Sequence, residues 1–335
     1  MRILVVDVAA EHSGAVTILN QFIDEFKAEV KNEYYVVLSV LDYQETENVY
    51  FLKLNWVKRS HIHRLFFDNV YIKKLIHRIR PDMVLSLQNK TVSSGRIPQD
   101  VYFHNVLPIA EKRFKLRESK KLWVYQNVIG LLVRKSLKKA RNITVQAEWI
   151  KRDLSEKWKI DEDRIFVKRP RMNFSNFNTY PHRNDVKGCH LFYPANGAIY
   201  KNHISLLKAC AGIWDSEGLD CGLTLTLTGK KDDLSKACQA LLDGKSYPVH
   251  FVGRLNSSEM SEMYNCTALV FPSYMETIGL PLLEAMHFQC DILAADCKYV
   301  HETLDGYNNV AFFDPFDVMS IELSIRKHMG LLEKV

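Results

Sequence analysis

Short apolar runs separated by amphipathic stretches recur along the whole chain. The first run covers residues 3–6, and similar runs return near residues 35, 82 and 100. Apolar runs without polar alternation are typical of parallel strands that are covered on both faces. The stretches between them carry apolar residues three and four positions apart, as amphipathic helices do. This alternation predicts a doubly wound α/β chain.

The pattern places twelve strands and nine helices along the sequence. In the first half it predicts strands at 2–7, 35–40, 82–87, 100–104, 142–146 and 164–168, and helices at 14–29, 69–79, 119–139 and 147–157. In the second half it predicts strands at 190–193, 222–228, 248–252, 267–272, 290–294 and 309–313, and helices at 202–213, 231–242, 257–264, 280–288 and 316–330.

A stretch without periodicity separates the two halves. Residues 173–188 are rich in Asn and include Pro181 and Gly188, so they are expected to form a linker. A chain of 335 residues has room for two domains. We therefore expect a Rossmann-like domain at 1–172, a second at 189–318 and a C-terminal helix at 319–335.

The richest motif is VFPSYMETIGLPLLEAMHF, which occupies residues 270–288. A strand breaks at Pro272, and a helix begins near Pro281, a residue suited to the first helical turn. Free N–H groups in such a turn attract phosphate. Glu276 and Glu284 lie eight residues apart around this turn. They are placed to flank a ligand with hydroxyls on both sides of a diphosphate, such as a nucleotide-sugar.

This frame resembles the E-x7-E signature of retaining family-4 glycosyltransferases, whose GT-B fold has two Rossmann-like domains facing a central cleft. The resemblance implies that Glu276 contacts the donor sugar and Glu284 holds the ribose hydroxyls. It also implies that the last helix returns to the first domain. The backbone expected along the sugar and the phosphates belongs to Thr277, Ile278, Gly279 and Leu280.

Residues 192–203, FYPANGAIYKNH, follow a strand and lead into a helix. A lysine at a helix start meets a diphosphate as a point charge. Family members carry an Arg and a Lys here on the donor phosphates. Lys201 matches the Lys, whereas Asn196 stands where the Arg is expected. Arg254, which follows a strand of the same domain, is the candidate substitute.

Two further positions in the first half match the family by context. His104 ends a strand where many members carry a histidine that approaches the donor sugar or its phosphate. Gly14 belongs to the loop after the first strand, where the family places glycines near the phosphates, and glycine allows close approach of a ligand. An ordinary strand-end histidine and an ordinary βα turn explain the same residues.

Charge is concentrated in one part of the chain. Residues 51–171 hold 29 Lys/Arg and 11 Asp/Glu, whereas 1–50 and 172–335 are each acidic. Residues 112–141 alone hold eleven basic residues around an apolar, aromatic stretch and one acid, Glu118. Basic and aromatic residues together suit an anionic membrane surface. Nucleic acid is the rival polyanion, but no recognisable nucleic-acid motif accompanies the charge.

Cofactor chemistry finds little support in the sequence. The seven cysteines form no C-x-x-C pair and are expected to be reduced thiols. Asp161-Glu162-Asp163 has a metal-binding D-x-D form, but its position between a helix and a strand predicts a solvated turn. We expect no cofactor and no obligatory metal. The first residues read as a strand and no apolar run approaches about 20 residues, so we expect a cytoplasmic protein.

Together these features predict a retaining hexosyltransferase that uses a nucleoside-diphosphate sugar. Its expected acceptor is a polyprenyl-diphosphate-linked glycan of O-antigen, lipopolysaccharide or another surface polysaccharide, at the inner face of the plasma membrane. Two alternatives remain open: a nucleotide-sugar epimerase or phosphorylase of the same fold, and a non-catalytic partner subunit that binds nucleotide-sugar.

Overall fold

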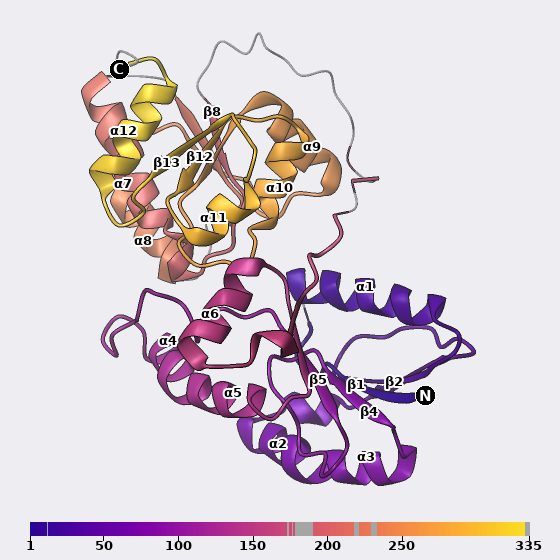
Figure 1. Ribbon diagram of the computed structural model, residues 1–335. Helices are drawn as coiled ribbons and strands as arrows, with labels where there is room; N and C mark the ends of the chain where they lie inside the picture. Colours follow the sequence, from indigo (N-terminus) through magenta and orange to yellow (C-terminus); the bar gives the residue numbers. More distant parts are fainter. Residues whose placement is uncertain are drawn as a thin grey trace. The chain divides into compact units, whose positions relative to one another are not determined.

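The computed structural model describes residues 1–11, 13–172, 174–175, 177, 190–217, 221–228 and 233–331. The chain forms two compact units, Met1–Arg171 and Met172–Val335, each built around one parallel sheet (Figure 1). The sequence predicted a boundary at residue 172. Most of the predicted linker, 173–188, lies outside the described residues.

The first unit contains a seven-stranded parallel sheet in the order β3-β2-β1-β4-β5-β6-β7. Its strands are β1 (Arg2–Val6), β2 (Glu33–Leu38), β3 (Val49–Lys53), β4 (Met83–Ser86), β5 (Gln99–Phe103), β6 (Asn142–Val145) and β7 (Ile165–Val167). Its helical segments are α1 (Ser13–Ala28), η1 (Asn55–Lys58), α2 (His61–Phe66), η2 (Phe67–Tyr71), α3 (Ile72–Ile79), α4 (Lys120–Val124), η3 (Tyr125–Ile129), α5 (Gly130–Leu137), α6 (Glu148–Trp158) and η4 (Glu162–Arg164).

Strand β1 shows why the predicted strands carry uninterrupted apolar runs. Ile3 and Val5 join the core cluster formed with α1 on one face of the sheet. Leu4 and Val6 join the cluster on the other face, together with buried residues of η2 and α3. Because successive side chains of a strand point to opposite faces, a sheet covered on both faces needs apolar residues at every position.

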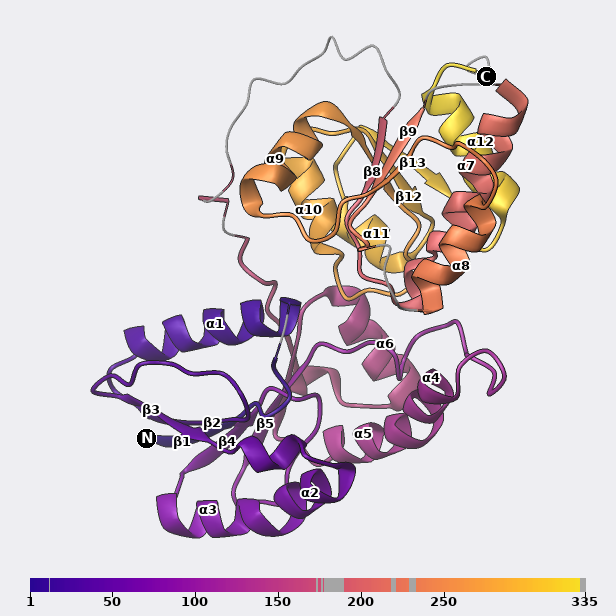
Figure 2. The same cartoon turned by 180° about the vertical axis from the view of Figure 1, so that it is seen from behind.

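The second unit contains a six-stranded parallel sheet in the order β10-β9-β8-β11-β12-β13. Its strands are β8 (His190–Tyr193), β9 (Gly222–Leu225), β10 (Val249–Phe251), β11 (Ala268–Phe271), β12 (Ile292–Ala295) and β13 (Val310–Phe313). Its helical segments are η5 (Ile199–Lys201), α7 (His203–Glu217), α8 (Asp233–Leu242), α9 (Ser257–Cys266), α10 (Leu280–His287), α11 (Lys298–Thr303) and α12 (Val318–His328). Helices α9 and α10 lie on one side of this sheet, and α7, α8 and α12 lie on the other (Figures 1 and 2).

The predicted class, two Rossmann-like α/β domains, is confirmed. Among the described strands and α-helices, β3, α2 and α11 were missed, as were the short segments η1, η4 and η5. β3 is an edge strand with mostly half-buried residues, so its apolar signal is weaker than that of the central strands. Both missed α-helices have only six residues, too few to show a helical period. The last helix, α12, packs against α7 and β13 of its own unit. The return of residues 319–335 to the first domain, which the resemblance implied, stays a prediction.

Asp7 is a buried carboxyl group that follows β1 directly. Its Oδ1 accepts a hydrogen bond from the Ala10 amide at 3.2 Å. Burial nevertheless raises the pKa of Asp7 to about 7, because the charged form loses its hydration. The hydrogen bond from Ala10 and the nearby positive charges offset only part of this effect.

Replacing Asp7 by Asn keeps an acceptor oxygen and removes the ionisation. The folded protein binds this proton more tightly than the unfolded chain, so Asp7 costs stability as the pH rises from about 4 to about 7. Relative to the unsubstituted protein, Asp7→Asn should gain up to about 1.4 kcal/mol per pH unit in this window. Urea unfolding at several pH values measures the gain, and a pH-independent difference would contradict the assignment.

Candidate active site

The candidate site lies where the strand order of the second sheet reverses. The chain runs outward from β8 through β9 to β10, then returns to place β11 on the other side of β8. Loops from two adjacent parallel strands therefore leave the same edge in opposite directions, which opens a ligand crevice in this class of sheet. Lys201 belongs to the loop after β8, and Glu276 to the loop after β11.

The structure joins these two predicted residues directly. Lys201 Nζ forms an ion pair with Glu276 Oε1, and only 13% and 19% of the two side chains are exposed. The Ser273 hydroxyl donates a second hydrogen bond to the same carboxylate oxygen at 2.9 Å. The Glu276 carboxylate is thus held by one cation and one hydroxyl in a partly desolvated place, where such contacts are strong.

Hydrogen bonds from tyrosines fix the positions of the loops after β8 and β11. The Tyr274 amide donates to the Tyr200 carbonyl at 3.1 Å, which joins the loops backbone to backbone. Tyr193 donates its hydroxyl to the Lys201 carbonyl at 2.7 Å, and Tyr299 donates to the Ser273 carbonyl at 2.5 Å. Both Tyr193 and Tyr299 are buried. The Lys201–Glu276 pair therefore rests on buried anchors from β8 and α11.

Gly279 makes the turn into α10 possible. Its φ of +79° and ψ of +75° are left-handed, a conformation that glycine adopts without steric cost. A Cβ at this position would lie 3.0 Å from Leu282 Cδ1 and 3.3 Å from the rings of Phe271 and Tyr299. Pro281 follows within the first turn of α10. The glycine of the motif is therefore required by the turn itself.

Glu284 lies one turn into α10 and is partly buried. Its Oε2 accepts a hydrogen bond from the Tyr264 hydroxyl at 2.7 Å. Burial raises the pKa of Glu284, and the hydrogen bond from Tyr264 opposes part of that shift. Tyr264 is fully buried on α9, stacked on Phe288. A rigid phenol thus fixes the orientation of this carboxylate.

The other residues predicted to bind the donor in the second unit lie in the loops at the same edge of the sheet. Thr277 and Ile278 form the turn before Gly279, and Thr303 Oγ1 donates to the Ile278 carbonyl at 2.7 Å. Leu280 begins α10. The Asn196 side chain is exposed, and its Oδ1 accepts from the Ala198 amide at 3.2 Å. Asn196 therefore shapes its loop, and no cation stands at that position.

Arg254 is exposed in the loop after β10, the outermost strand of the sheet. Two strands separate β10 from β11, which places their axes about 14 Å apart. Among the described residues, no hydrogen bond or ion pair joins Arg254 to Lys201 or Glu276. Its role as a substitute for the missing arginine stays a prediction.

His104 and Gly14 belong to the first unit. Gly14 lies in the first turn of α1, after β1, and His104 follows β5. The His104 amide donates to Asn89 Oδ1 at 2.7 Å. Burial lowers the pKa of His104 to about 4, so the ring is neutral near pH 7. Its buried Nδ1 has no hydrogen-bond partner among the described residues.

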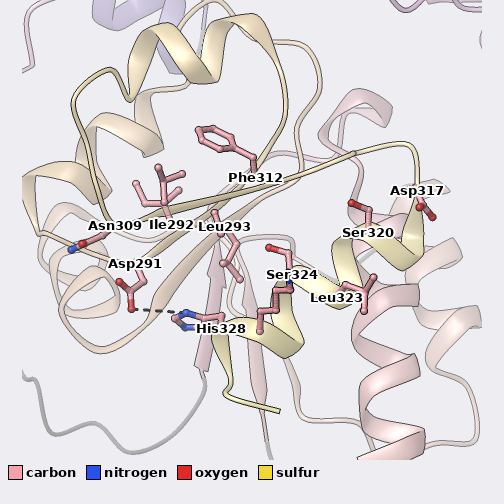
Figure 3. Close-up of a pocket in the computed structure, with 13 residues that line it drawn as sticks. Asp291, Ile292, Leu293, Asn309, Phe312, Asp317, Ser320, Leu323, Ser324 and His328 are labelled. Atoms are coloured by element: carbon pink, nitrogen blue, oxygen red, sulfur yellow. Dashed lines mark ion pairs between the residues drawn. The ribbon is translucent and has the colours of Figure 1, made fainter. Parts of the chain in front are cut away.

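An open hollow of about 930 Å³ lies elsewhere in the second unit, between β12, β13 and α12 (Figure 3). Leu293 and Phe312 line it from the sheet, and His328 faces Asp291 across one end, with Nδ1 and Oδ2 3.9 Å apart. None of the predicted site residues lines this hollow. It is separate from the candidate site.

Four site residues escaped the sequence analysis: Ser273, Tyr193, Tyr264 and Tyr299. Ser273 lies within the motif, and its place between Pro272 and Glu276 was the available signal. The tyrosines lie on other elements and carry no local pattern. Within the described part of the chain, no group of three or more His, Cys, Asp or Glu side chains is arranged to hold a metal ion.

Comparison with known proteins agrees with this geometry. Residues 181–331 match the family described as glycosyl transferases group 1. The C-terminal unit is a group 1 glycosyltransferase domain. The match contains the loop after β8, the Gly279 turn and both glutamates of the motif, so the group 1 domain carries the whole Lys201–Glu276–Glu284 set.

A curated relative of this chain is the O-antigen chain mannosyltransferase RfbU of Salmonella typhimurium. The two sequences are 24% identical over 200 residues, which is 58% of this chain and 53% of RfbU. The match thus spans about half the length of that relative.

Solved structures show that the whole chain has the GT-B fold. The sucrose-phosphate synthase of Thermosynechococcus elongatus superposes with a TM-score of 0.72 at 15% identity, over 98% of this chain and 90% of that one. WaaG, a glycosyltransferase involved in lipopolysaccharide biosynthesis, gives 0.71 at 13% identity over 98% and 90%. Anabaena HepE in complex with UDP and glucose gives 0.69 at 15% identity over 98% and 89%.

Gly279→Ala tests the turn that positions the motif. The left-handed backbone costs about 1–2 kcal/mol for alanine, and the new Cβ meets three side chains. Gly244→Ala is the matched control, because Gly244 has a φ of +74° and nothing within 4 Å of its Cβ position. The free energy of unfolding should fall about 1–3 kcal/mol further in Gly279→Ala than in the control. Equal losses would show that the surrounding side chains tolerate the methyl group.

Proposed function

We propose that the protein is a retaining glycosyltransferase that transfers a hexose from a nucleoside-diphosphate sugar to a glycan acceptor in O-antigen or related lipopolysaccharide synthesis. The observation that carries this proposal is the Lys201–Glu276 pair beside the Gly279 turn at the strand-order reversal. The group 1 domain, the relative RfbU and the UDP complex of HepE support the choice of chemistry.

The reaction breaks the bond between the sugar C1 and a diphosphate oxygen, so the site must stabilise the departing diphosphate. Lys201 supplies a cation, and the free N–H groups at the start of α10 supply oriented dipoles. Glu284 would hold the ribose hydroxyls, since its carboxylate is fixed by Tyr264. The charge needed by the leaving group thus comes from the chain, and we propose that turnover requires no metal.

Glu276 would orient the sugar and stabilise positive charge that develops on its ring. Its carboxylate is already oriented by Lys201 and Ser273, so little reorganisation is needed when the sugar binds. We propose that the acceptor oxygen attacks C1 on the face from which the diphosphate leaves. The acceptor proton then passes to a diphosphate oxygen, and the configuration at C1 is retained.

The acceptor is proposed to be a polyprenyl-diphosphate-linked glycan, reached by peripheral contact with an anionic membrane. The basic charge of residues 51–171 supports this part of the proposal. None of the described helices is both long and apolar enough to span a membrane.

A thermal-shift screen of nucleotide-sugars in the presence of EDTA tests the donor and the metal together. A ligand that binds the folded state alone raises the melting temperature. Product analysis then follows with the best donor, with and without acceptor. A change in the donor without acceptor would indicate an epimerase, transfer to phosphate a phosphorylase, and binding without turnover a partner subunit. Each of these results would replace the proposal.

Lys201→Ala and Glu276→Ala should each lower turnover about a hundredfold or more, because each removes charge aligned with the transition state. Lys245→Ala is the control: Lys245 also forms an ion pair, with Asp215, but on an exposed surface of the same unit. Initial rates of sugar transfer at saturating donor measure the effect. Near-normal turnover in both site variants would refute the assignment.

Tyr264→Phe keeps the buried ring and removes the hydrogen bond to Glu284. The carboxylate then loses its orientation, and its pKa rises further, so nucleotide affinity should fall about tenfold. Tyr307→Phe is the control, since the Tyr307 hydroxyl also donates a hydrogen bond, to the Cys290 carbonyl. Calorimetric titration with the preferred nucleotide measures both variants. Equal affinities would show that Tyr264 has a packing role alone.

A further inference from the structure

Two helical segments of the first unit expose apolar stripes to solvent. Val124, Val128, Leu131 and Leu132 are exposed along α4, η3 and α5, at positions i, i+4, i+7 and i+8. Ile62, Leu65, Phe66 and Val70 are exposed along α2 and η2, at i, i+3, i+4 and i+8. These spacings place each set along one side of its helix. Scattered surface hydrophobics would show no such order.

The opposite sides of both helices already form the core. Phe67, Ile72 and Leu75 of η2 and α3 are buried in the core cluster on the sheet, and Val133 and Leu137 of α5 are also buried. The sequence analysis favoured an anionic membrane surface for the basic and apolar stretch of 112–141, and four of its apolar residues, Val124, Val128, Leu131 and Leu132, are exposed. A helix whose solvent-facing side is also apolar is expected to bury that side against a second partner.

The two stripes belong to one surface of the first unit. Helices α2 and α5 lie side by side in both views (Figures 1 and 2). The short loop after β4 touches both segments, because the Thr91 amide donates to Ser136 Oγ and the Ser93 amide donates to the Asp68 carbonyl. We call this surface, formed by 61–72 and 116–137, the apolar face.

Positive charge surrounds the apolar face. Residues 55–80 contain seven Lys/Arg and one acid, Asp68, which is buried and paired with Arg64 and Lys90. Residues 112–141 contain eleven Lys/Arg and one acid, Glu118, which is paired with Lys112. Exposed basic residues without a carboxylate partner in the described structure include Lys73, Lys74, Arg113, Arg117, Lys120, Lys121, Lys135, Lys138 and Lys139. The uncompensated charge therefore lies beside the apolar stripes.

We propose that the apolar face inserts into the interface of an anionic lipid bilayer, with both helices lying in the membrane plane. The aliphatic stripes enter the boundary between headgroups and acyl chains, and the surrounding lysines and arginines contact anionic headgroups. The combination favours lipid over a second copy of the chain, because two such faces would bring their positive charges together. The inference deepens the membrane contact under the proposed function, and it requires no sugar transfer.

The test is co-sedimentation of the full chain with vesicles of phosphatidylglycerol and phosphatidylcholine, compared with vesicles of phosphatidylcholine alone. Binding should require phosphatidylglycerol and should weaken as salt is raised. Leu131→Ser combined with Leu132→Ser should lower the partition coefficient at least about tenfold, since it removes apolar groups from the interface. Lys120→Gln combined with Lys121→Gln should lower it about fivefold per lysine.

A matched pair of single variants separates the apolar face from general surface hydrophobicity. Ile62 on the face is 78% exposed, and Val30, outside the face and beyond α1, is 77% exposed. Ile62→Ser should weaken vesicle binding, and Val30→Ser should leave it unchanged. Because all these side chains are exposed, thermal unfolding of the variants should match that of the unsubstituted protein.

Three results would overturn the proposal. One is binding that resists every substitution on the apolar face. Another is binding that depends on the lysines and on phosphatidylglycerol but is unaffected by the serine variants, which would mean electrostatic adsorption without insertion. The third is a dimer in light scattering that dissociates on Leu131→Ser/Leu132→Ser. No sugar donor or glycan acceptor is present in these assays. A negative result in them would therefore leave the proposed transfer reaction unaffected, and a failure of the transfer assays would leave the membrane inference unaffected.

Discussion

The parallel pairing of β8 with β11 is the constraint on which the candidate site depends. Neither loop is a site alone: Lys201 follows one strand and Glu276 the other. Hydrogen bonding of the two strands fixes both loop starts at one edge of the sheet. The backbone hydrogen bond between Tyr274 and Tyr200 then holds the two loops against each other, and the ion pair joins their side chains. Residues 75 positions apart are thereby held as one unit.

Much of this was predictable from sequence, for physical reasons that differ by residue. Strands covered on both faces leave uninterrupted apolar runs, so the central strands and the α/β class were readable. Glu276, Gly279 and Glu284 were readable because one turn places them, and a turn is local. Lys201 was readable from its position after a strand together with the family resemblance.

Other parts depend on contacts that no local pattern records. Tyr264 reaches Glu284 from another helix, and Tyr299 reaches Ser273 from α11, a helix too short to predict. The apolar residues of 122–133 fit a core helix equally well by periodicity, and only the packed structure shows which of them face outward. Arg254 was chosen because it follows a strand of the same domain, and no local pattern shows that this strand, β10, lies at the outer edge of the sheet.

The ion pair between Lys201 and Glu276 also means that the site carries its own counter-ion. A free phosphate ion meets a cation whose charge is already balanced, and it repels the carboxylate beside that cation. In the proposed reaction, a nucleotide-sugar offers hydroxyls to the carboxylate at the same time as its diphosphate meets the ammonium. The pair would then select for molecules that bring both chemistries at once, and it would discriminate against the simpler anions that any isolated lysine attracts.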